Sequence, residues 1–319
     1  MPLDPFLVPF LETLPGTPPS IDDWPAFRAA DDAAANALVG PVIEPGPPVQ
    51  SVETVVIPVR GGSVTAAVYT PFSDGPHPLH LYLHGGGFVF GSAHTAPVDA
   101  LCRERTVAAD CVTVAVNYRK APEHQYPTGL DDAQDALLWA VDHAEELGID
   151  PSRISIGGCS AGANLAAALT LKLRDEDGPR VMFQLLEVPA LDLTFQSPSV
   201  QEHATGYGLD LPTLHMLGPL YLADTARAAA DPYISPLLAE DLSGLPKTYA
   251  MSAEFDPLRD DAPRFVDRLR ASGVPASGYL GRGHIHGSGA YTAAMESARR
   301  WRQHALTALT AAHQPEAPQ

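Results

Sequence analysis

Hydrophobic and polar residues alternate along the chain after residue 50, with the period of two that is typical of strands. The alternation covers residues 52–59 and 64–69, and Gly61-Gly62 separates the two runs. Two alternating runs joined by a short turn predict a β-hairpin. The same alternation at residues 79–83 and 112–116 predicts two further strands.

Downstream of residue 150, short apolar runs are separated by patterns with helical spacing. Strands that alternate with helices predict an α/β fold, with a mostly parallel central sheet and helices on both of its faces. The apolar runs lie at residues 154–156, 181–188, 248–251 and 277–280, and the helical patterns lie at residues 161–173 and 260–271.

Two parts of the chain do not follow this rhythm. Residues 1–50 are rich in Pro and Ala and contain one helical stretch at residues 25–38, which Gly40-Pro41 should end. Between residues 193 and 230 the strands stop, and a helical segment rich in Gly, His and Leu intervenes. We therefore expect a central domain of residues 51–192 and 231–319, an N-terminal segment 1–50, and an insertion 193–230 above the sheet.

The balance of charges excludes several classes of partner. The chain has 319 residues, with 20 Lys and Arg against 38 Asp and Glu, which gives a net charge of −18 at pH 7. So acidic a surface repels nucleic-acid phosphates and anionic lipid headgroups, and we expect no nucleic-acid binding. No apolar run reaches the roughly 18 residues that a membrane-spanning helix needs, so no stable membrane insertion is expected.

The N-terminus and the cysteines predict a cytoplasmic location. Prolines interrupt the first apolar stretch, and the first basic residue is Arg28, so the pattern of a secretory signal is missing. The three cysteines are Cys102, Cys111 and Cys159. An odd, sparse set without paired spacing indicates free thiols in a reducing compartment.

The central chemical signal is a turn between a predicted strand and a predicted helix, with the sequence Gly158-Cys159-Ser160-Ala161-Gly162. A G-x-S-x-G turn in this context is typical of a nucleophile elbow, in which a strained backbone exposes the serine hydroxyl. The small flanking residues let the strand and the helix approach closely. Ser160 is the candidate nucleophile, and an ordinary glycine-rich turn is the alternative.

A second glycine-rich turn, with the sequence HGGGF, starts at His84 directly after a predicted strand. Glycines at this position let backbone N–H groups face a cleft, where they can bind the oxyanion of a tetrahedral intermediate. We expect Gly86, Gly87 and Ala161 to supply these N–H groups, with Gly85 shaping the turn. We expect His84 to brace the loop rather than to transfer protons.

A serine nucleophile in such a turn needs a carboxylate and then a histidine later in the chain. Asp256 follows the predicted strand at residues 248–251, at the sheet edge where loops carry functional groups. Glu254, Asp260 and Asp261 compete for this role, but the two aspartates begin the next predicted helix and are expected to act as N-terminal helix charges. Asp256 is the candidate acid.

Two histidines, His284 and His286, follow the last predicted strand. A loop at this point can place an imidazole between Ser160 and Asp256. Spacing alone leaves both histidines as candidates for the base.

Several separated strings make the chain similar to a known family. They are the HGGGF turn, APEHQYP at residues 121–127 with LDDA at 130–133, EFDPLRD at 254–260, and His286-Gly287. In this order they resemble the hormone-sensitive-lipase family of serine esterases, from about residue 50 to about residue 290. The resemblance implies the α/β-hydrolase fold with a helical cap over the active site.

The resemblance also selects among the candidates. In the family the base directly precedes a glycine, which favours His286 over His284. The family usually has Asp before the nucleophile, where this chain has Cys159, and an aromatic residue after the glycine, where this chain has Ser288. We expect Cys159 to be a small buried residue that packs behind the nucleophile and takes no part in acyl transfer.

These residues predict a carboxylesterase in which Ser160 attacks the carbonyl, His286 transfers the proton and Asp256 orients the imidazole. The resemblance implies short- to medium-chain esters as substrates. The chemistry needs no cofactor, and the sequence has no metal cluster, Walker loop or dinucleotide fingerprint. The alternatives are an arylacetamide-type amidase or deacetylase, a catalytically silent receptor-like binding module, and a lyase-type tailoring enzyme. The expected partner is a small-molecule ester, and a homodimer is left open.

The implied cap would consist of residues 1–50 and 193–230. The first of these segments has an apolar, partly helical spacing of large side chains. We expect it to cover the acyl pocket together with part of the insertion, and packing on the hydrolase body is the alternative. The apolar residues are Phe6, Leu7, Phe10, Leu11 and Leu14.

Overall fold

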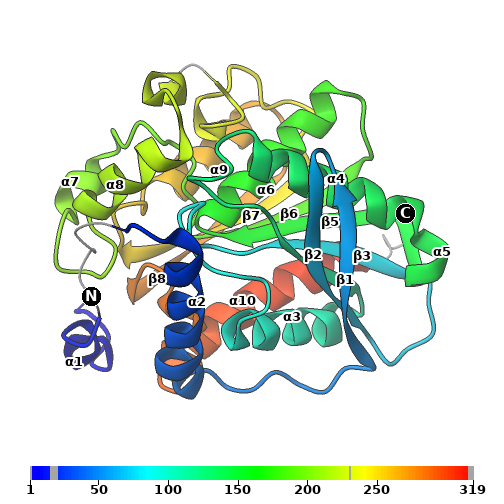
Figure 1. Ribbon diagram of the computed structural model, residues 1–319, viewed down its shortest axis with the longest axis horizontal. Helices are drawn as coiled ribbons and strands as arrows, with labels where there is room; N and C mark the ends of the chain where they lie inside the picture. Colours follow the sequence, from blue (N-terminus) through cyan, green and yellow to red (C-terminus); the bar gives the residue numbers. More distant parts are fainter. Residues whose placement is uncertain (1, 15–20, 230, 315–319) are drawn as a thin grey trace.

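Eight strands form one sheet, in the order β1-β2-β4-β3-β5-β6-β7-β8, in the computed structural model (Figure 1). The structure describes residues 2–14, 21–229 and 231–314. β1 pairs antiparallel with β2, and β2 with β4, while all other neighbours are parallel. The strands are β1 (Ser51–Val59), β2 (Gly62–Thr70), β3 (His77–Leu83), β4 (Val112–Asn117), β5 (Ile149–Cys159), β6 (Val181–Glu187), β7 (Lys247–Phe255) and β8 (Ala276–Ile285).

The predicted hairpin is confirmed by the pairing of β1 with β2. Val59 pairs with Gly62 across the turn, and Gly61 between them has a φ of +74°, which glycine adopts without strain. β3 differs from these outer strands because all seven of its residues are buried. Its central place between β4 and β5 explains this, since helices cover both faces of the sheet there.

Helices cover both faces of the sheet (Figure 1). α3 and α10 pack against each other on one face, and α4, α6 and α9 lie on the opposite face. The predicted α/β class is therefore confirmed. The helices are α1 (Leu7–Leu11), α2 (Trp24–Ala34), α3 (Ala96–Ala109), α4 (Thr128–Asp142), α5 (Ala144–Leu147), α6 (Ala161–Asp175), α7 (Pro198–Glu202), α8 (Leu211–Tyr221), α9 (Asp261–Ala271) and α10 (Glu296–His313).

The helix α6 follows β5 directly and lies deep in the core. Its sequence is dominated by Ala and Leu, which have high helix propensity, and most of its residues are buried. Lys172 and Arg174 in its last turn are favoured by the partial negative charge at a helix C-terminus. Because β5 and α6 are both fixed by core packing, the turn between them has little freedom to move.

The N-terminal part is helical over a longer stretch than the sequence predicts. α2 begins after Asp23, whose carboxylate accepts the N–H of Ala26 at 2.9 Å as an N-cap. After α2 the chain continues through a π-helical turn (Ala35–Val39) and a 3-10 turn (Gly40–Val42). The expected end at Gly40 is therefore wrong, because this glycine keeps helical dihedrals, φ −47° and ψ −48°.

The segment after β6 contains the helices α7 and α8 in place of strands, as the sequence predicts for this stretch (Figure 1). α8 is tied to the loop that precedes α4. The N–H of Tyr126 donates to the Tyr221 carbonyl at 3.0 Å, and Gln125 Nε2 donates to the Leu220 carbonyl at 3.1 Å. These bonds fix the C-terminal end of α8 against that loop.

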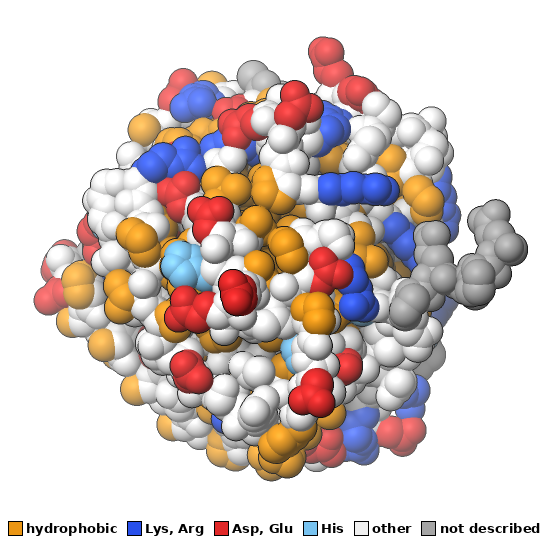
Figure 2. Space-filling view, turned by 90° about the vertical axis from the view of Figure 1, so that its right-hand side faces the viewer, with side chains coloured by type: hydrophobic (Ala, Val, Ile, Leu, Met, Phe, Trp, Pro, Cys, Tyr) orange, Lys and Arg blue, Asp and Glu red, His pale blue; other side chains and the backbone are white. Residues whose placement is uncertain are grey.

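None of the helices in the described part of the chain combines the length and the apolarity required to cross a lipid bilayer. The face shown in Figure 2 carries acidic side chains spread among basic and apolar ones. The excess of negative charge is therefore distributed over this face and does not form one patch.

Candidate active site

Ser160 lies in the sharp turn between β5 and α6. Its φ of +56° and ψ of −120° are strained for a residue with a side chain. A Cβ added to Gly158 would lie 2.4 Å from the Gly162 backbone, and one added to Gly162 would lie 2.1 Å from the Leu83 carbonyl oxygen. Only glycine allows these approaches, so the structure has the strand–turn–helix geometry at the position that the sequence predicts.

His286 lies between Ser160 and Asp256. Its Nε2 is 2.9 Å from Ser160 Oγ, and its Nδ1 is 2.8 Å from Asp256 Oδ2. Asp256 is 0% exposed, and its other carboxylate oxygen accepts the N–H of Leu258 at 2.8 Å. A carboxylate held in this way orients the imidazole with Nε2 toward the serine hydroxyl. The loops after β7 and β8 and the turn after β5 thus bring the three predicted residues together.

His284, the alternative base, is engaged elsewhere. Its Nδ1 lies 2.8 Å from Ser288 Oγ, and its ring packs against Trp301. Burial lowers the pKa of His284. Ser288 Oγ also accepts the N–H of Ile285 at 3.1 Å. Ser288, which stands where the resemblance implies an aromatic residue, therefore orders the loop that carries His286.

The other carboxylates near Asp256 also have partners away from the imidazole. Glu254 accepts the N–H of Gly283 at 2.7 Å. Asp260 precedes α9, as expected, and accepts the N–H of Ser199 at 2.9 Å. The structure thus brings Asp256 to the histidine and leaves these alternatives outside the site.

Asp261 begins α9, as the sequence predicts, but its role is more than that of a helix charge. Its buried carboxylate accepts the N–H groups of Leu191 and Asp192, at 2.8 and 3.1 Å, and the Ser197 hydroxyl at 3.0 Å. Burial raises the pKa of Asp261 to about 7. The residue fixes the loop after β6, and no sequence pattern signals this function.

The loop after β3 brings the predicted glycines to Ser160. Gly86 and Gly87 have φ values of +124° and +59°, and a Cβ on Gly86 would lie 2.2 Å from the Phe90 carbonyl oxygen. Gly85 packs against the elbow, since a Cβ there would lie 3.4 Å from Ser160 Cβ. These three glycines, Ser160 and Ala161 all line the same pocket. The loop after β3 and the turn after β5 therefore meet at one wall of this pocket.

His84 braces this loop, as the sequence predicts. The Tyr118 hydroxyl donates to the His84 carbonyl at 2.8 Å, and His84 Nδ1 lies 2.7 Å from the Gly85 carbonyl oxygen. The two rings stack with their centroids 4.3 Å apart. Burial lowers the pKa of His84 well below its ordinary value, so the imidazole is neutral at pH 7.

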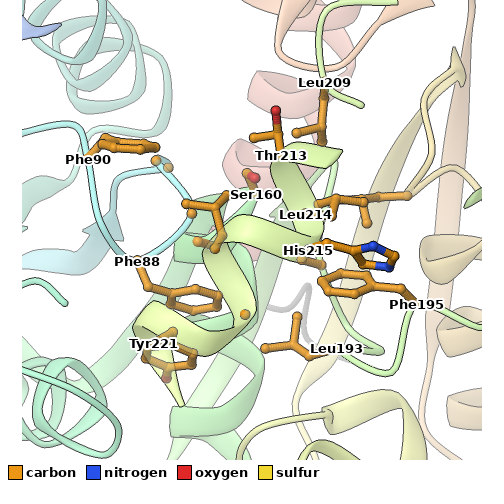
Figure 3. A pocket seen from close by; sticks show the side chains of 18 of the residues that line it. Phe88, Phe90, Ser160, Leu193, Phe195, Leu209, Thr213, Leu214, His215 and Tyr221 are labelled. Atoms are coloured by element: carbon orange, nitrogen blue, oxygen red, sulfur yellow. The ribbon is translucent and has the colours of Figure 1, made fainter. Parts of the chain in front are cut away.

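A cavity of about 540 Å³ opens beside Ser160 and His286. Figure 3 shows α8 crossing it, with Phe88 and Tyr221 next to each other, and their rings stack at 3.8 Å. Among the described residues, the lining contains no Asp, Glu, Lys or Arg. Its other large apolar side chains include Phe90, Leu193, Phe195, Leu209, Leu214 and Leu217.

The sequence did not single out these pocket residues. Most of them lie in or near the segment 193–230, whose Leu-rich helical pattern is equally typical of an ordinary core helix. Phe88 belongs to the HGGGF string, and Tyr221 follows a proline inside α8. Only the tertiary arrangement shows that both side chains face the same cavity.

The apolar residues of α1 do not line this cavity. Leu7 is fully buried and packs with Ile285, Tyr291 and Met295, on the side of β8 and α10. The expectation that this helix covers the acyl pocket is therefore wrong, and packing on the hydrolase body is what the structure has. Phe6, Phe10 and Leu11 join the same cluster.

Cys159 as a whole residue is half-buried, so the expectation of a small buried residue is met only in part. It contributes to the pocket lining next to Ser160. Burial of the thiol, followed by the negative charge of Glu187, raises the pKa of Cys159 to about 12. Little thiolate forms at neutral pH, which makes this sulfur a weak nucleophile.

Over residues 2–14, 21–229 and 231–314, no group of three or more His, Cys, Asp or Glu side chains is arranged to hold a metal ion.

Comparisons with known proteins agree with this fold. A family model described as alpha/beta hydrolase fold matches residues 80–289. The esterase LipI of Mycobacterium tuberculosis is 33% identical over 310 residues, covering 96% of this chain and 94% of LipI. The carboxylic ester hydrolase LipN of the same organism is 39% identical over 266 residues, covering 82% of this chain and 69% of LipN. The hyperthermophilic esterase of Pyrobaculum calidifontis has a TM-score of 0.89 and 34% identity, covering 98% of this chain and 99% of that one.

Proposed function

The chain belongs to the hormone-sensitive-lipase-like group of the α/β-hydrolase fold family, and on this basis we propose that it hydrolyses carboxylic esters through an acyl-enzyme formed on Ser160. One observation carries the proposal: Ser160, His286 and Asp256 form a continuous hydrogen-bonded chain at the wall of an apolar pocket. The esterases among its relatives support the reaction class.

In the proposed reaction, His286 Nε2 accepts the hydroxyl proton while Ser160 Oγ bonds to the ester carbonyl carbon. The carbonyl electrons move to the oxygen, and Asp256 stabilises the imidazolium. When the intermediate collapses, the bond to the alcohol oxygen breaks and His286 gives its proton to the leaving group. Water then loses a proton to His286 and attacks the acyl carbon. When this second intermediate collapses, the bond to Ser160 Oγ breaks, His286 returns the proton to Oγ, and the acid leaves.

We assign the oxyanion to the backbone N–H groups of Gly86, Gly87 and Ala161, with Gly85 shaping the turn. Backbone N–H groups that point at the developing charge stabilise the transition state more than the ground state, and each is worth roughly 10²–10³ in rate. The place of Gly86, Gly87 and Ala161 in the pocket lining beside Ser160 supports this assignment.

The pocket supports neutral esters with short to medium acyl chains as substrates. Its volume of about 540 Å³ lies in the range for small-molecule sites, and its described lining has no Asp, Glu, Lys or Arg side chain. A charged acyl group would lose its hydration without gaining an ionic partner.

We also propose the roles of the remaining segments. Residues 193–230 would form a cap insertion over a catalytic domain of residues 51–192 and 231–319, and the contribution of α8 to the pocket wall supports this. Residues 1–50 would form an N-terminal segment that packs against the catalytic domain, as Leu7 does beside Ile285. Three free cysteines fit a reducing compartment such as the cytoplasm. The partner would be a small-molecule ester, and a homodimer stays a prediction.

The test is steady-state hydrolysis of 4-nitrophenyl esters by single variants. Ser160→Ala and His286→Ala should each lower kcat by about 10⁴–10⁶, with little change in thermal stability. His284→Ala should retain most of the turnover, because this ring faces Ser288. If His284→Ala silenced the enzyme and His286→Ala did not, the assigned base would be wrong.

Two further measurements separate the alternatives. A fluorophosphonate should label Ser160 in the wild type and not in Ser160→Ala, whereas absence of labelling in both would favour a silent binding module. Matched ester and anilide substrates with one acyl group distinguish an esterase from an amidase. Faster cleavage of the anilide would overturn the esterase proposal.

A further inference from the structure

The loop that carries the proposed oxyanion donors has an unusual backbone. Gly86, Gly87 and Phe88 have successive φ values of +124°, +59° and +65°. Phe88 is not a glycine, so its conformation is strained and persists only where the surroundings enforce it. Inside the loop, the N–H groups of Val89 and Phe90 both donate to the Gly86 carbonyl, at 3.0 and 2.8 Å. These two bonds share one acceptor and do not by themselves fix three such residues.

Arg28 binds this loop from outside. Its Nε donates to the Val89 carbonyl at 2.8 Å, and its Nη2 donates to the Ala121 carbonyl at 2.9 Å. The N–H of Ala121 in turn donates to the Phe88 carbonyl at 3.0 Å. A guanidinium is planar and offers its donors in a fixed fork, so the two carbonyls are held at a defined separation.

The charge of Arg28 is balanced on the same side. Its Nη1 donates to Glu123 at 2.9 Å, and this pairing lowers the pKa of the Glu123 carboxyl. The Arg28 side chain is 18% exposed and that of Glu123 is 38% exposed. Because water reaches the carboxylate more readily than the guanidinium, the pair alone stabilises the protein little. The bonds from Arg28 to backbone carbonyls are the more specific part of the contact.

Aromatic packing adds a second contact between α2 and the loop. The Phe90 ring lies 5.5 Å from the Phe27 ring and 6.3 Å from the Trp24 ring, centroid to centroid. Phe90 also lines the pocket beside Ser160. α2 therefore contacts the loop through a charged side chain and through two aromatic ones.

We propose that Arg28 is a positioning residue for the oxyanion hole. By fixing the Val89 carbonyl and, through Ala121, that of Phe88, it holds the N–H groups of Gly86 and Gly87 in the geometry that the transition state needs. Arg28 touches no reacting atom. The inference rests on the proposed ester hydrolysis, and it gives the N-terminal segment a role in rate rather than in covering the substrate.

The test compares Arg28→Ala with Arg28→Lys and with a matched control, Arg103→Ala. Arg103 is a partly exposed arginine of α3 that pairs with Asp99 four residues earlier and lies outside the pocket lining. For 4-nitrophenyl acetate, Arg28→Ala should lower kcat by about 10- to 100-fold with little change in KM. This is the scale expected when a group that contacts the transition state is misplaced by up to about 1 Å. Arg28→Lys should stay impaired, because one ammonium cannot reproduce the fork.

A benzeneboronic acid reports the oxyanion hole separately from turnover. Ser160 Oγ adds to boron, and the resulting tetrahedral anion needs the same N–H donors as the transition state. Its inhibition constant should rise in Arg28→Ala by a factor close to the loss in kcat and stay unchanged in Arg103→Ala. Added guanidinium at millimolar concentration should restore part of the activity of Arg28→Ala and none of that of Arg28→Lys.

The outcomes are distinct. If Arg28→Ala lowers the unfolding temperature but leaves kcat and boronate binding at wild-type values, the residue is merely structural and the inference is overturned. If Arg28→Ala does not fold, Arg28→Lys replaces it in the test, and wild-type values of kcat and boronate affinity in Arg28→Lys overturn the inference. If Ser160→Ala remains active, the proposed function fails, and the role of Arg28 fails with it.

Discussion

Cys159 and Glu187 lie directly opposite each other on the neighbouring parallel strands β5 and β6. The Glu187 carbonyl accepts the N–H of Ser160 at 2.9 Å. Its buried carboxylate is bound by Arg105 and by Trp301 Nε1, the latter at 2.8 Å. On β6, the residue that pairs with Cys159 thus carries a carboxylate bound by Arg105, whereas Cys159 itself carries a thiol.

This relationship predicts how Cys159 tolerates substitution. Cys159→Ala should keep most of the esterase activity and lose about 1 kcal/mol of the free energy of unfolding, the usual scale for a small truncation. Cys159→Asp, which introduces the residue usual in the family, should cost more, about 2–4 kcal/mol. It places a second carboxylate next to Glu187, whose charge already raises the pKa of the thiol. Urea denaturation of both variants measures the difference.

The same thiol should react slowly. Burial raises the pKa of Cys159, Cys102 and Cys111 alike to about 12, so iodoacetamide should modify none of them quickly at pH 7. Mass spectrometry of the adducts provides the measurement. Rapid modification of Cys159 with a parallel loss of activity would show a thiol-sensitive active site instead.

The close contact between Gly87 and Leu217 predicts that activity lost on substitution of Gly87 can be recovered by a second substitution. A Cβ on Gly87 would lie 2.5 Å from Leu217 Cδ1, and the φ of +59° adds backbone strain. Gly87→Ala should lower kcat by about 10- to 100-fold, comparable to the loss of one oxyanion donor. Adding Leu217→Ala should recover part of this loss, because it removes the clash.

Gly206→Ala is the matched control for backbone strain. Gly206 also has a positive φ, +92°, but a Cβ there would meet no atom within 4 Å. This variant should lose some stability and keep its kcat. If the Gly87→Ala and Leu217→Ala double variant is no more active than Gly87→Ala, contact with Leu217 is not the cause.

Asp261 predicts a pH-dependent contribution to stability. Its pKa is raised from 3.8 to about 7 in the folded state, so the folded chain holds a proton that the unfolded chain has released between these values. Stability from this group is therefore complete below about pH 4 and is lost as the pH rises through about 7, by at most about 4 kcal/mol. Asp192 on the adjoining loop and Arg264 on α9 lie near Asp261 and pair with each other, and both are kept in the variant described next.

Thermal unfolding of Asp261→Asn between pH 4 and pH 8 is the measurement. Asn keeps an oxygen that can accept the N–H groups of Leu191 and Asp192, and it does not titrate. Relative to the wild type, Asp261→Asn should gain stability steadily as the pH rises from about 4 to about 7. A difference in unfolding temperature that stays constant with pH would contradict the assignment.

Gly218 predicts how the pocket can be shortened. It lines the cavity, and a Cβ on it would meet no atom within 4 Å, so a larger side chain there can occupy the cavity. Gly218→Leu should lower kcat/KM for 4-nitrophenyl octanoate about tenfold more than for the acetate. Gly218→Ala serves as the control and should leave the ratio of octanoate to acetate close to that of the wild type. Equal losses for both esters in Gly218→Leu would argue against a role in acyl-chain length.

The sequence predicts those parts of the molecule that depend on local pattern. The hairpin at β1 and β2 and the turn around Ser160 follow from alternation and from glycines at fixed spacing, because these features act over a few residues. The choice of His286 over His284 needed the family resemblance, since both histidines lie in the same short loop. The structure adds the reason: Ser288 binds His284, whereas His286 faces Ser160.

The features that escaped prediction depend on contacts between distant segments. Arg28 and Val89 are 61 residues apart, and Asp261 and Leu191 are 70 residues apart. An arginine in a Pro- and Ala-rich segment, or an aspartate at a helix start, has an ordinary local explanation. The apolar spacing of α1 was compatible with covering a pocket or with packing on the body, and only the position of Ile285 and Tyr291 decides between them.

The helix α8 has one consequence for how selectivity could change in this protein. Leu217 packs against Gly87, and Tyr221 stacks on Phe88. The residues of α8 that shape the pocket therefore also pack against the loop that carries the proposed N–H donors. A substitution that admits a bulkier ester by trimming Leu217 or Tyr221 would release that loop at the same time. Directed evolution toward new substrates through this helix should therefore yield broader variants that turn over more slowly, and recovery of speed should require second changes on the α2 side of the loop.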